Sequence, residues 1–314
     1  MKYIKIKYLF LYKAFFKYKK YFFINLCFFF FLFLKKKRNI KIALCTMAKK
    51  ENLYINEFIN YYIKLGTEKI FIYDDNDSNT ERIKDVINPT KNKYVTIYDN
   101  IKSKIKNQAD VFTHCYNYHK KEYDWFIMVD ADEYLVVINN TLKNYLSNVK
   151  FKKCDFIKIH WLIPTDNDLL HYNNKSLFER FKGPYKKSIH IKTIIRGNIN
   201  QLKYWVHSPL SSPYKNNTCN NEGILINKSI INFEYIKEIN INKAYIIHFK
   251  YKSTEEYINK YKRGYSNWID SASLFSKITE YLKDNKITKE KIDYFEKELK
   301  LNLTKYRKYI KKII

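Results

Sequence analysis

Apolar and polar positions alternate along the chain in blocks that predict strands and helices in turn. Short apolar runs typical of buried strands cover residues 40–45, 69–73, 94–98 and 125–129. Between the first two runs, residues 52–65 carry apolar side chains at helical spacing and end at Gly66, a residue common just after helices. Further helices are expected from about residue 80 and over residues 103–121. This order predicts an α/β fold with a mainly parallel, Rossmann-like sheet flanked by helices.

Acidic side chains come directly after three of the predicted strands: Asp74, Asp75, Asp99, Asp130, Asp132 and Glu133. The carboxyl ends of parallel strands meet at one edge of a sheet, so these acids are expected to converge there. Three carboxylates within residues 130–133 repel one another beside a buried strand unless a cation lies between them. Asp130 and Asp132 therefore predict a Mg²⁺ or Mn²⁺ site, because these hard ions share carboxylate oxygens with diphosphates. A D-x-D motif alone leaves an ordinary acidic turn open as the alternative.

The two ends of the chain differ in pattern from the middle. Residues 21–34 form an apolar run between lysine-rich stretches, shorter than the ~20 residues that span a bilayer comfortably. We expect residues 1–38 to anchor the protein to a membrane, either across it or at its surface. Residues 286–314 predict a basic amphipathic helical tail that packs on the domain or lies on an anionic membrane. The domain between them covers residues 39–285.

Composition narrows the possible partners. The 314 residues include 59 basic and 31 acidic side chains, a formal net charge of +28 that by itself favours nucleic acid or an anionic membrane. However, Lys, Asn, Ile, Tyr and Phe are abundant while Gly and Pro occur 5 times each, as an A+T-rich genome would impose. The basic side chains are dispersed along the chain, and no nucleic-acid-binding motif accompanies them. We therefore expect no nucleic-acid partner. Dinucleotide and P-loop motifs are also absent, which favours phosphate binding through a metal.

The cysteines predict a reducing environment. There are five, an odd number, and none forms a C-x-x-C pair. Cys45, Cys115 and Cys154 lie in or beside apolar segments, where a free thiol behaves as a small core residue. We therefore expect the domain on the cytoplasmic side of a membrane.

Four blocks of sequence, in order, resemble glycosyltransferases of the GT-A type, in the branch of family 2-like and family 92-like enzymes. The blocks are residues 43–80, WFIMVDADEYL at 125–135, HWLIPTDND to LFERF at 160–181, and IIHFKYKSTEEYINKYKRG at 246–264. The second block is similar to a W-x-x-x-x-D-x-D-E-[FY] signature of these enzymes. The resemblance covers residues 40–268, most of the chain.

The resemblance implies a nucleotide-sugar donor whose diphosphate is held by Mn²⁺ or Mg²⁺ on Asp130 and Asp132. His248, at the end of a strand predicted over residues 244–247, would complete the metal shell, with His207 as its rival. Asp74 or Asp75 would contact the nucleoside. Further donor-side residues implied in this way are Thr46, Glu51, Gln108, Lys252, Lys260 and Arg263.

The catalytic base is less defined. Glu179 is the first candidate for the carboxylate that an inverting enzyme needs, and Asp166 and Asp168 are the others in the acceptor-side region. The family's glycine-containing turn after the tryptophan is replaced here by residues 162–165, which leaves the acceptor side undefined.

The resulting prediction is a metal-dependent glycosyltransferase, a hexosyltransferase by its resemblance, that transfers a sugar to a glycan or lipid-linked acceptor at a membrane. The alternatives are another metal-dependent nucleotide-sugar or nucleotidyl transferase, or a non-catalytic basic module binding membranes or nucleic acid. Mn²⁺-dependent donor hydrolysis distinguishes the enzymes from the module, which would bind polyanions with a steep salt dependence and no need of metal.

Overall fold

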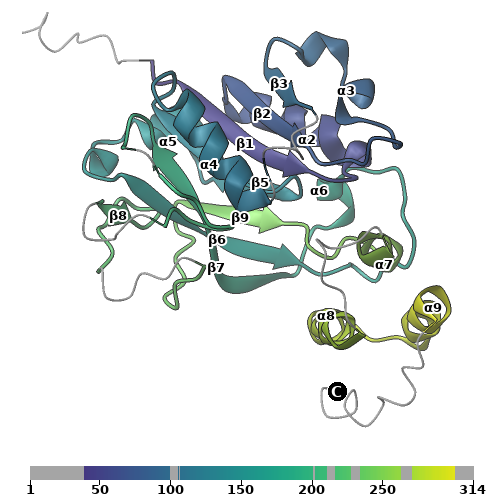
Figure 1. Cartoon of the computed structure of the whole chain (residues 1–314). Helices are drawn as coiled ribbons and strands as arrows, with labels where there is room; N and C mark the ends of the chain where they lie inside the picture. The colour runs from purple at the N-terminus through teal and green to yellow at the C-terminus, as the bar shows by residue number, and fades with distance from the viewer. Residues whose placement is uncertain are drawn as a thin grey trace, which may run out of the picture. The chain divides into compact units, whose positions relative to one another are not determined.

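The computed structural model describes residues 39–99, 105, 107–200, 202–210, 216–227, 234–262 and 271–300. The described residues from Lys41 onward belong to one compact unit (Figure 1). The expected membrane anchor, residues 1–38, lies outside the described residues. Within the ranges given above, no helix combines the length and apolar character needed to cross a membrane.

The described residues contain one sheet, with strands in the order β3-β2-β1-β4-β7-β6-β9-β5 and β8 paired with β6. The strands are β1 (Ile42–Ala48), β2 (Lys69–Asp74), β3 (Val95–Tyr98), β4 (Trp125–Met128), β5 (Glu133–Val137), β6 (Phe156–Pro164), β7 (Tyr185–Arg196), β8 (Thr218–Cys219) and β9 (Ala244–His248). Strands β3, β2, β1 and β4 are parallel, as predicted. The other half is not, because β7 runs antiparallel to both β4 and β6, and β5 antiparallel to β9.

The prediction of a mainly parallel sheet is thus wrong for half of the fold, and the sheet is mixed. The reason lies in the connections. Strands β6 and β7 lie side by side without a crossover across the sheet, and antiparallel neighbours need none. Their long pairing extends the parallel half at β4.

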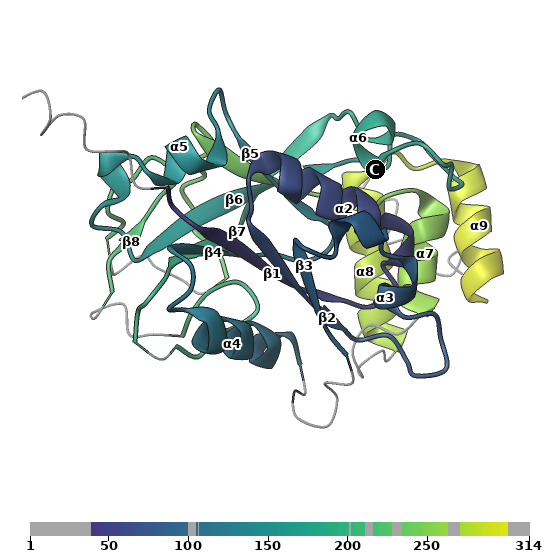
Figure 2. The same ribbon diagram turned by 90° about the horizontal axis from the view of Figure 1, so that it is seen from above.

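Helices cover both faces of the sheet. They are α2 (Asn52–Leu65), α3 (Ile83–Val86), α4 (Gln108–His119), α5 (Leu142–Leu146), α6 (Leu177–Arg180), α7 (Thr254–Lys262), α8 (Ser271–Asp284) and α9 (Lys289–Leu299), with 3-10 turns at Pro89–Lys91 and Val149–Phe151. Helices α2 and α4 lie on opposite faces of β1 (Figure 2). Helices α7, α8 and α9 gather at one end of the sheet in both views (Figures 1 and 2).

Helix α2 has the bounds that its apolar pattern predicts. Its stripe of Ile55, Phe58, Ile59 and Tyr62 is buried. Gly66 ends the helix with φ +110, a left-handed conformation that glycine adopts without steric cost, and its N–H donates to the carbonyls of the last turn. The apolar face, not intrinsic propensity, holds this helix on the sheet, because each large side chain buried contributes about 1.5–3 kcal/mol.

Helix α4 is shorter than predicted because it begins at Gln108. The side chain of Asn107 caps it by accepting a hydrogen bond from the N–H of Asp110. Its inner face packs on β1 and β4 in one core cluster that includes Phe112, Cys115, Tyr116, Ala43, Cys45, Phe126 and Met128. This packing fixes the first residue of the helix at the carboxyl ends of the parallel strands.

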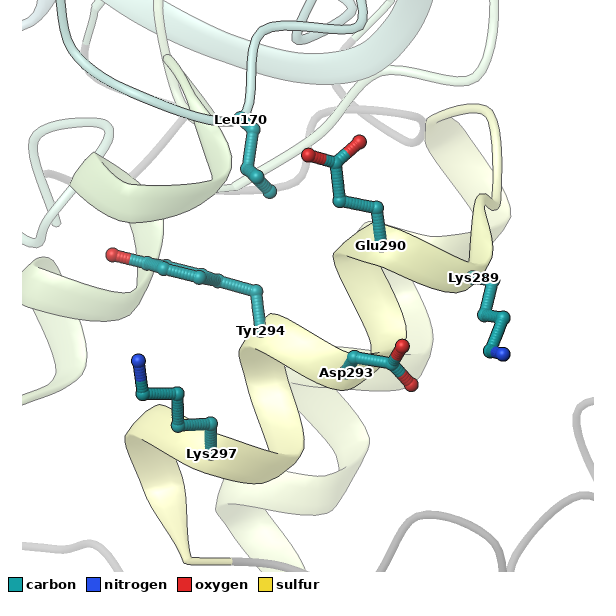
Figure 3. Close-up of a pocket in the computed structure, with 6 residues that line it drawn as sticks. All are labelled: Leu170, Lys289, Glu290, Asp293, Tyr294 and Lys297. Atoms are coloured by element: carbon teal, nitrogen blue, oxygen red, sulfur yellow. The ribbon is translucent and has the colours of Figure 1, made fainter.

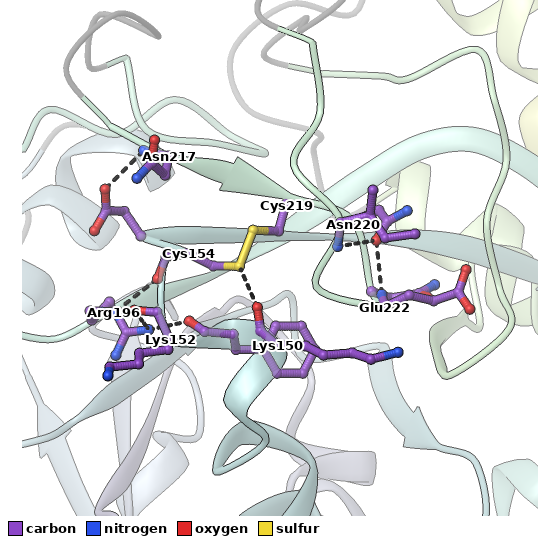
Figure 4. Close-up of a disulfide and its surroundings, with 12 residues drawn as sticks. Lys150, Lys152, Cys154, Arg196, Asn217, Cys219, Asn220 and Glu222 are labelled. Atoms are coloured by element: carbon purple, nitrogen blue, oxygen red, sulfur yellow. Dashed lines mark hydrogen bonds between the residues drawn. A yellow bond between two sulfur atoms is a disulfide. The ribbon is translucent and has the colours of Figure 1, made fainter.

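A disulfide joins Cys154, before β6, to Cys219 in β8 (Figure 4). The prediction of a free thiol at Cys154 is therefore wrong. Because disulfides persist mainly in oxidising compartments, the cysteines no longer indicate a reducing environment. Spacing in the sequence could not reveal this pair, since 65 residues separate its members. Cys45 and Cys115 are buried and free, as expected.

Candidate functional site

Three acidic side chains, Asp130, Asp132 and Glu133, form what we call the acid cluster. They lie between the end of β4 and the start of β5. Strand β5 pairs antiparallel with β9 in a register that places Glu133 opposite His248. The imidazole consequently lies 3.6 Å from Asp132 (Nε2 to Oδ1) and 3.8 Å from Glu133 (Nδ1 to Oε1). The structure thus brings His248 to the acids, as the resemblance implies.

Two lysines balance the charge of the acid cluster. Lys192 Nζ, from β7, lies 2.9 Å from Asp130 Oδ1 and 3.6 Å from Glu133 Oε2. Lys260 Nζ, from α7, lies 2.9 Å from Asp132 Oδ2. These ammonium groups supply part of the positive charge that three adjacent carboxylates require. Lys192 is almost entirely buried, so it acts as a fixed counter-ion.

Burial gives the members of the cluster different proton affinities. Burial and the negative charge of Asp130 raise the pKa of Glu133 well above its usual value, despite the nearby Lys192. Burial would also raise the pKa of Asp132, but Lys260 and His248 outweigh it and hold that pKa well below its usual value. Burial lowers the pKa of His248, which keeps its imidazole neutral and able to act as a ligand. The acid cluster and His248 therefore combine the ionised carboxylate of Asp132, the carboxyl of Glu133 with its raised pKa, and a neutral imidazole.

Gln108, the first residue of α4, donates a hydrogen bond to Asp130 from its side-chain amide. Thr46, near the end of β1, is fully buried, and its hydroxyl has no hydrogen-bond partner among the described residues. Glu51, just before α2, pairs with Lys252 at 3.0 Å between Oε2 and Nζ. Lys252 has φ +56, an uncommon conformation for a lysine, and its ammonium lies 4.1 Å from the ring centre of Tyr54.

The acids after β2 have separate surroundings. Asp74 is buried and accepts hydrogen bonds from Arg82 Nε at 2.8 Å and from the N–H of Ile83 at 3.0 Å, which secures α3. Arg82 also pairs with Asp99 at 2.7 Å. Asp75 is more exposed and lies 3.7 Å from Lys49. Of the two acids expected near a nucleoside, Asp75 is thus the more accessible.

The three candidate bases lie in structural contacts away from the acid cluster. Glu179 caps α6 by binding the backbone and hydroxyl of Ser176 at 3.0 and 2.8 Å. Asp166 is buried beside Lys291 of α9 at 2.7 Å, and Lys291 also binds Asp168 at 3.2 Å. These pairs hold α9 against the end of β6. The described contacts give none of the three a place at the acid cluster.

Lys192 is the site residue that sequence reasoning missed. Its signal was a lysine between Ile191 and the pair Ile194 and Ile195 in the second half of β7, where an unpaired charge would be costly. His207, the rival of His248, has its Nδ1 3.1 Å from the carbonyl oxygen of Ile191, within reach of the charges of Lys192 and Asp130. Burial lowers its pKa to about 3. Arg263 lies outside the described residues.

The donor set of the acid cluster fits a hard divalent cation, because it offers carboxylate oxygens and a neutral imidazole at one edge of the sheet. Two buried atoms, Glu133 Oε1 and His248 Nδ1, lack a hydrogen-bond partner among the described residues. Among all the described residues, no group of three His, Cys, Asp or Glu side chains is already placed so that it could hold a metal ion. Instead, the carboxylates of Asp130 and Asp132 form ion pairs with Lys192 and Lys260.

A separate pocket of about 490 Å³ lies between Leu170 and helix α9 (Figure 3). Tyr294 faces Leu170 across it, and charged side chains of α9 complete its lining. It contains no residue of the acid cluster and no predicted site residue. We therefore place the candidate active site at the strand ends and not in this pocket.

The fold and the acid cluster define a mixed α/β domain with a charge-balanced polar site at the ends of its parallel strands. A family model described as "Glycosyltransferase family 92" matches residues 38–303. The chain belongs to glycosyltransferase family 92, which confirms the resemblance found in the sequence and supports a glycosyltransferase enzyme.

Three plant proteins illustrate the relationship. The chain is 26% identical over 118 residues to a glycosyltransferase family 92 protein of Oryza sativa subsp. japonica, covering 37% of this chain and 20% of the relative. It is 29% identical over 125 residues to one of Arabidopsis thaliana, covering 36% and 21%. A third, from Ricinus communis, is 26% identical over 101 residues, covering 32% and 18%. The matched segments thus span about a fifth of the length of these curated relatives.

Proposed function

We propose that this protein transfers a sugar, a hexose by its resemblance, from a nucleotide-sugar donor to a glycan or lipid-linked acceptor, and that Mn²⁺ or Mg²⁺ assists. The observation that carries the proposal is the meeting of Asp130, Asp132 and His248 at the ends of the parallel strands. Ligands of open α/β sheets bind at this edge.

Asp130 and Asp132, with His248, are the residues that would hold the metal. A divalent cation bound there would stabilise the negative charge of the departing nucleoside diphosphate. Gln108 and Lys192 fix the orientation of the Asp130 carboxylate by binding the same oxygen. Lys260 and Lys252 add positive charge beside Asp132, where a diphosphate would be bound.

The donor side extends from this cluster along the strand ends. Thr46 lies near the end of β1, Glu51 follows β1 and Asp75 follows β2, on the side where a nucleoside would lie. Glu179, Asp166 and Asp168 are no longer our first candidates for the base, because each is engaged in a local structural contact. Membrane association and the cellular compartment stay predictions, although the disulfide favours an oxidising compartment over the cytoplasm.

The proposal is tested by donor binding in Asp132→Asn. A panel of nucleotide sugars with Mn²⁺ should raise the Tm of the wild type, because a ligand at 100 times its Kd stabilises the native state by about 2.7 kcal/mol. Asp132→Asn should lose this shift. Asp168→Asn, which removes a partly exposed carboxylate at α9, is the matched control and should keep it.

Asp132→Asn also removes the ion pair between Asp132 and Lys260, so the variant is expected to unfold at a lower temperature without ligand. The readout is therefore the ligand-induced shift and not the Tm itself. If Asp132→Asn keeps the full Mn²⁺-dependent shift, the acid cluster does not hold the donor.

A further inference from the structure

Four rings, those of His248, Trp161, His190 and His207, contact one another beside the acid cluster. Trp161 of β6 packs against His248 with ring centres 4.5 Å apart. Trp161 also stacks on His190, with ring centres 5.2 Å apart and an interplanar angle of 17°. The ring centres of Trp161 and His207 are likewise 5.2 Å apart. His190 and His207 lie 6.1 Å apart. We call Trp161, His190 and His207, together with Trp205, which precedes His207 by two residues in the same loop, the aromatic platform.

An irregularity in the pairing of β6 and β7 creates this platform. His160 pairs with Ile191, but the next residue, Trp161, pairs with Ser188, so Ile189 and His190 have no partner on β6. His190 instead bridges to Tyr235. Bulges of this kind turn side chains toward sites at sheet edges, and here the bulge lays the imidazole over the indole of Trp161.

Trp205 extends the platform on a loop that is tied to the acid cluster. The carbonyl of Val206 accepts a hydrogen bond of 3.1 Å from Lys192 Nζ, the same ammonium group that binds Asp130. The carbonyl of His207 accepts one of 2.9 Å from the Thr193 hydroxyl. These bonds hold the loop against β7, so the position of Trp205 is coupled to that of the acids.

The indole of Trp205 is oriented and exposed at the same time. Its Nε1 donates to Glu234 Oε1 at 3.0 Å, yet 44% of the residue is accessible to solvent. His190 is exposed as well. Trp161 is 7% exposed, and its buried Nε1 has no hydrogen-bond partner among the described residues. The surface therefore offers apolar ring faces together with polar groups at their edges.

We propose that the aromatic platform binds a pyranose ring of the acceptor, with Trp205 as the stacking face. A pyranose has apolar C–H faces and hydroxyls around its rim, which matches the exposed indole of Trp205 with the Glu234 carboxylate at its edge. The inference rests on the proposed function, because it places this sugar beside the acids proposed to hold the donor diphosphate. It adds the acceptor's chemical class and the residues that recognise it.

The test uses the full chain and methyl pyranosides of galactose, glucose, mannose and N-acetylglucosamine as probes, without donor or metal. Saturation-transfer NMR titrations of wild type should detect binding of at least one glycoside. Trp205→Ala should raise its Kd roughly tenfold, the scale of one lost aromatic contact in a well-formed site. Trp205→Phe, which keeps a ring, should restore most of the affinity.

Tyr118→Ala is the matched control, because Tyr118 is an aromatic residue, 69% exposed, near the far end of α4 from Gln108. It should leave glycoside binding unchanged. Equal affinities of wild type and folded Trp205→Ala, or no binding of any of the four glycosides to wild type, would overturn the platform.

The same preparations are tested with nucleotide sugars and Mn²⁺ so that the two proposals can fail separately. Donor binding without Trp205-dependent glycoside binding removes the platform and leaves the proposed function. Trp205-dependent glycoside binding without any donor binding supports the platform as a sugar site and contradicts the proposed function.

Discussion

The disulfide between Cys154 and Cys219 allows a prediction with a defined magnitude. It closes a loop with a sequence separation of 65, which restricts the unfolded chain. Loop-closure entropy for about 65 residues corresponds to roughly 4 kcal/mol at 25 °C. Since domains are stable by about 5–15 kcal/mol, reduction should remove a large share of the free energy of unfolding.

The measurement is urea unfolding of the wild type with and without dithiothreitol. The double variant Cys154→Ser/Cys219→Ser is the control, since its midpoint should be low in both conditions and insensitive to the reductant. The backbone contacts around the bridge stay in place in that variant, including the 2.8 Å hydrogen bond from Arg196 Nε to the carbonyl of residue 154 (Figure 4).

Thiol labelling in denaturant provides the decisive check. Without reductant, Cys45 and Cys115 should be alkylated, whereas Cys154 and Cys219 should react only after reduction. Alkylation of all four residues without reduction, in protein purified under non-reducing conditions from an oxidising compartment, would refute the reasoning. That result would instead agree with the reducing environment that the number and spacing of the cysteines predicted.

Two further predictions concern buried lysines. Burial lowers the pKa of Lys158 from 10.5 to about 7, so between these values the unfolded chain binds the proton more tightly and stability rises with pH. Urea titrations give the free energy of unfolding of Lys158→Met and of the wild type at each pH. Any excess of the variant over the wild type should shrink from pH 7 to pH 10, by up to about 1.4 kcal/mol per pH unit. A difference between the two that does not change with pH would contradict this. Lys192→Met should lower the free energy of unfolding by about 3–5 kcal/mol, because it strands buried carboxylates. Lys262→Met, which breaks an ion pair at the surface, should cost less than about 1 kcal/mol, and equal losses in both variants would count against a fixed counter-ion at the acid cluster.

The sequence alone determined the local elements whose patterns are strong. Helix α2 and its glycine cap follow from an apolar stripe at helical spacing, and the parallel strands follow from short apolar runs between helices. Because parallel strands share one carboxyl edge, acids could be expected at that edge without coordinates, although Asp74 and Asp99 pair with Arg82 apart from the acid cluster. The motif blocks likewise predicted the family.

Tertiary structure alone decided which charges meet. Lys192 is 62 residues from Asp130 in sequence, and only the antiparallel return of β7 beside β4 brings its ammonium to the acids. The same holds for Cys154 and Cys219, and for Trp161 and His190, whose stacking depends on a bulge in the strand pairing. Periodicity reports which face of an element is buried, whereas strand order and register, which set these distances, depend on how all the elements pack together.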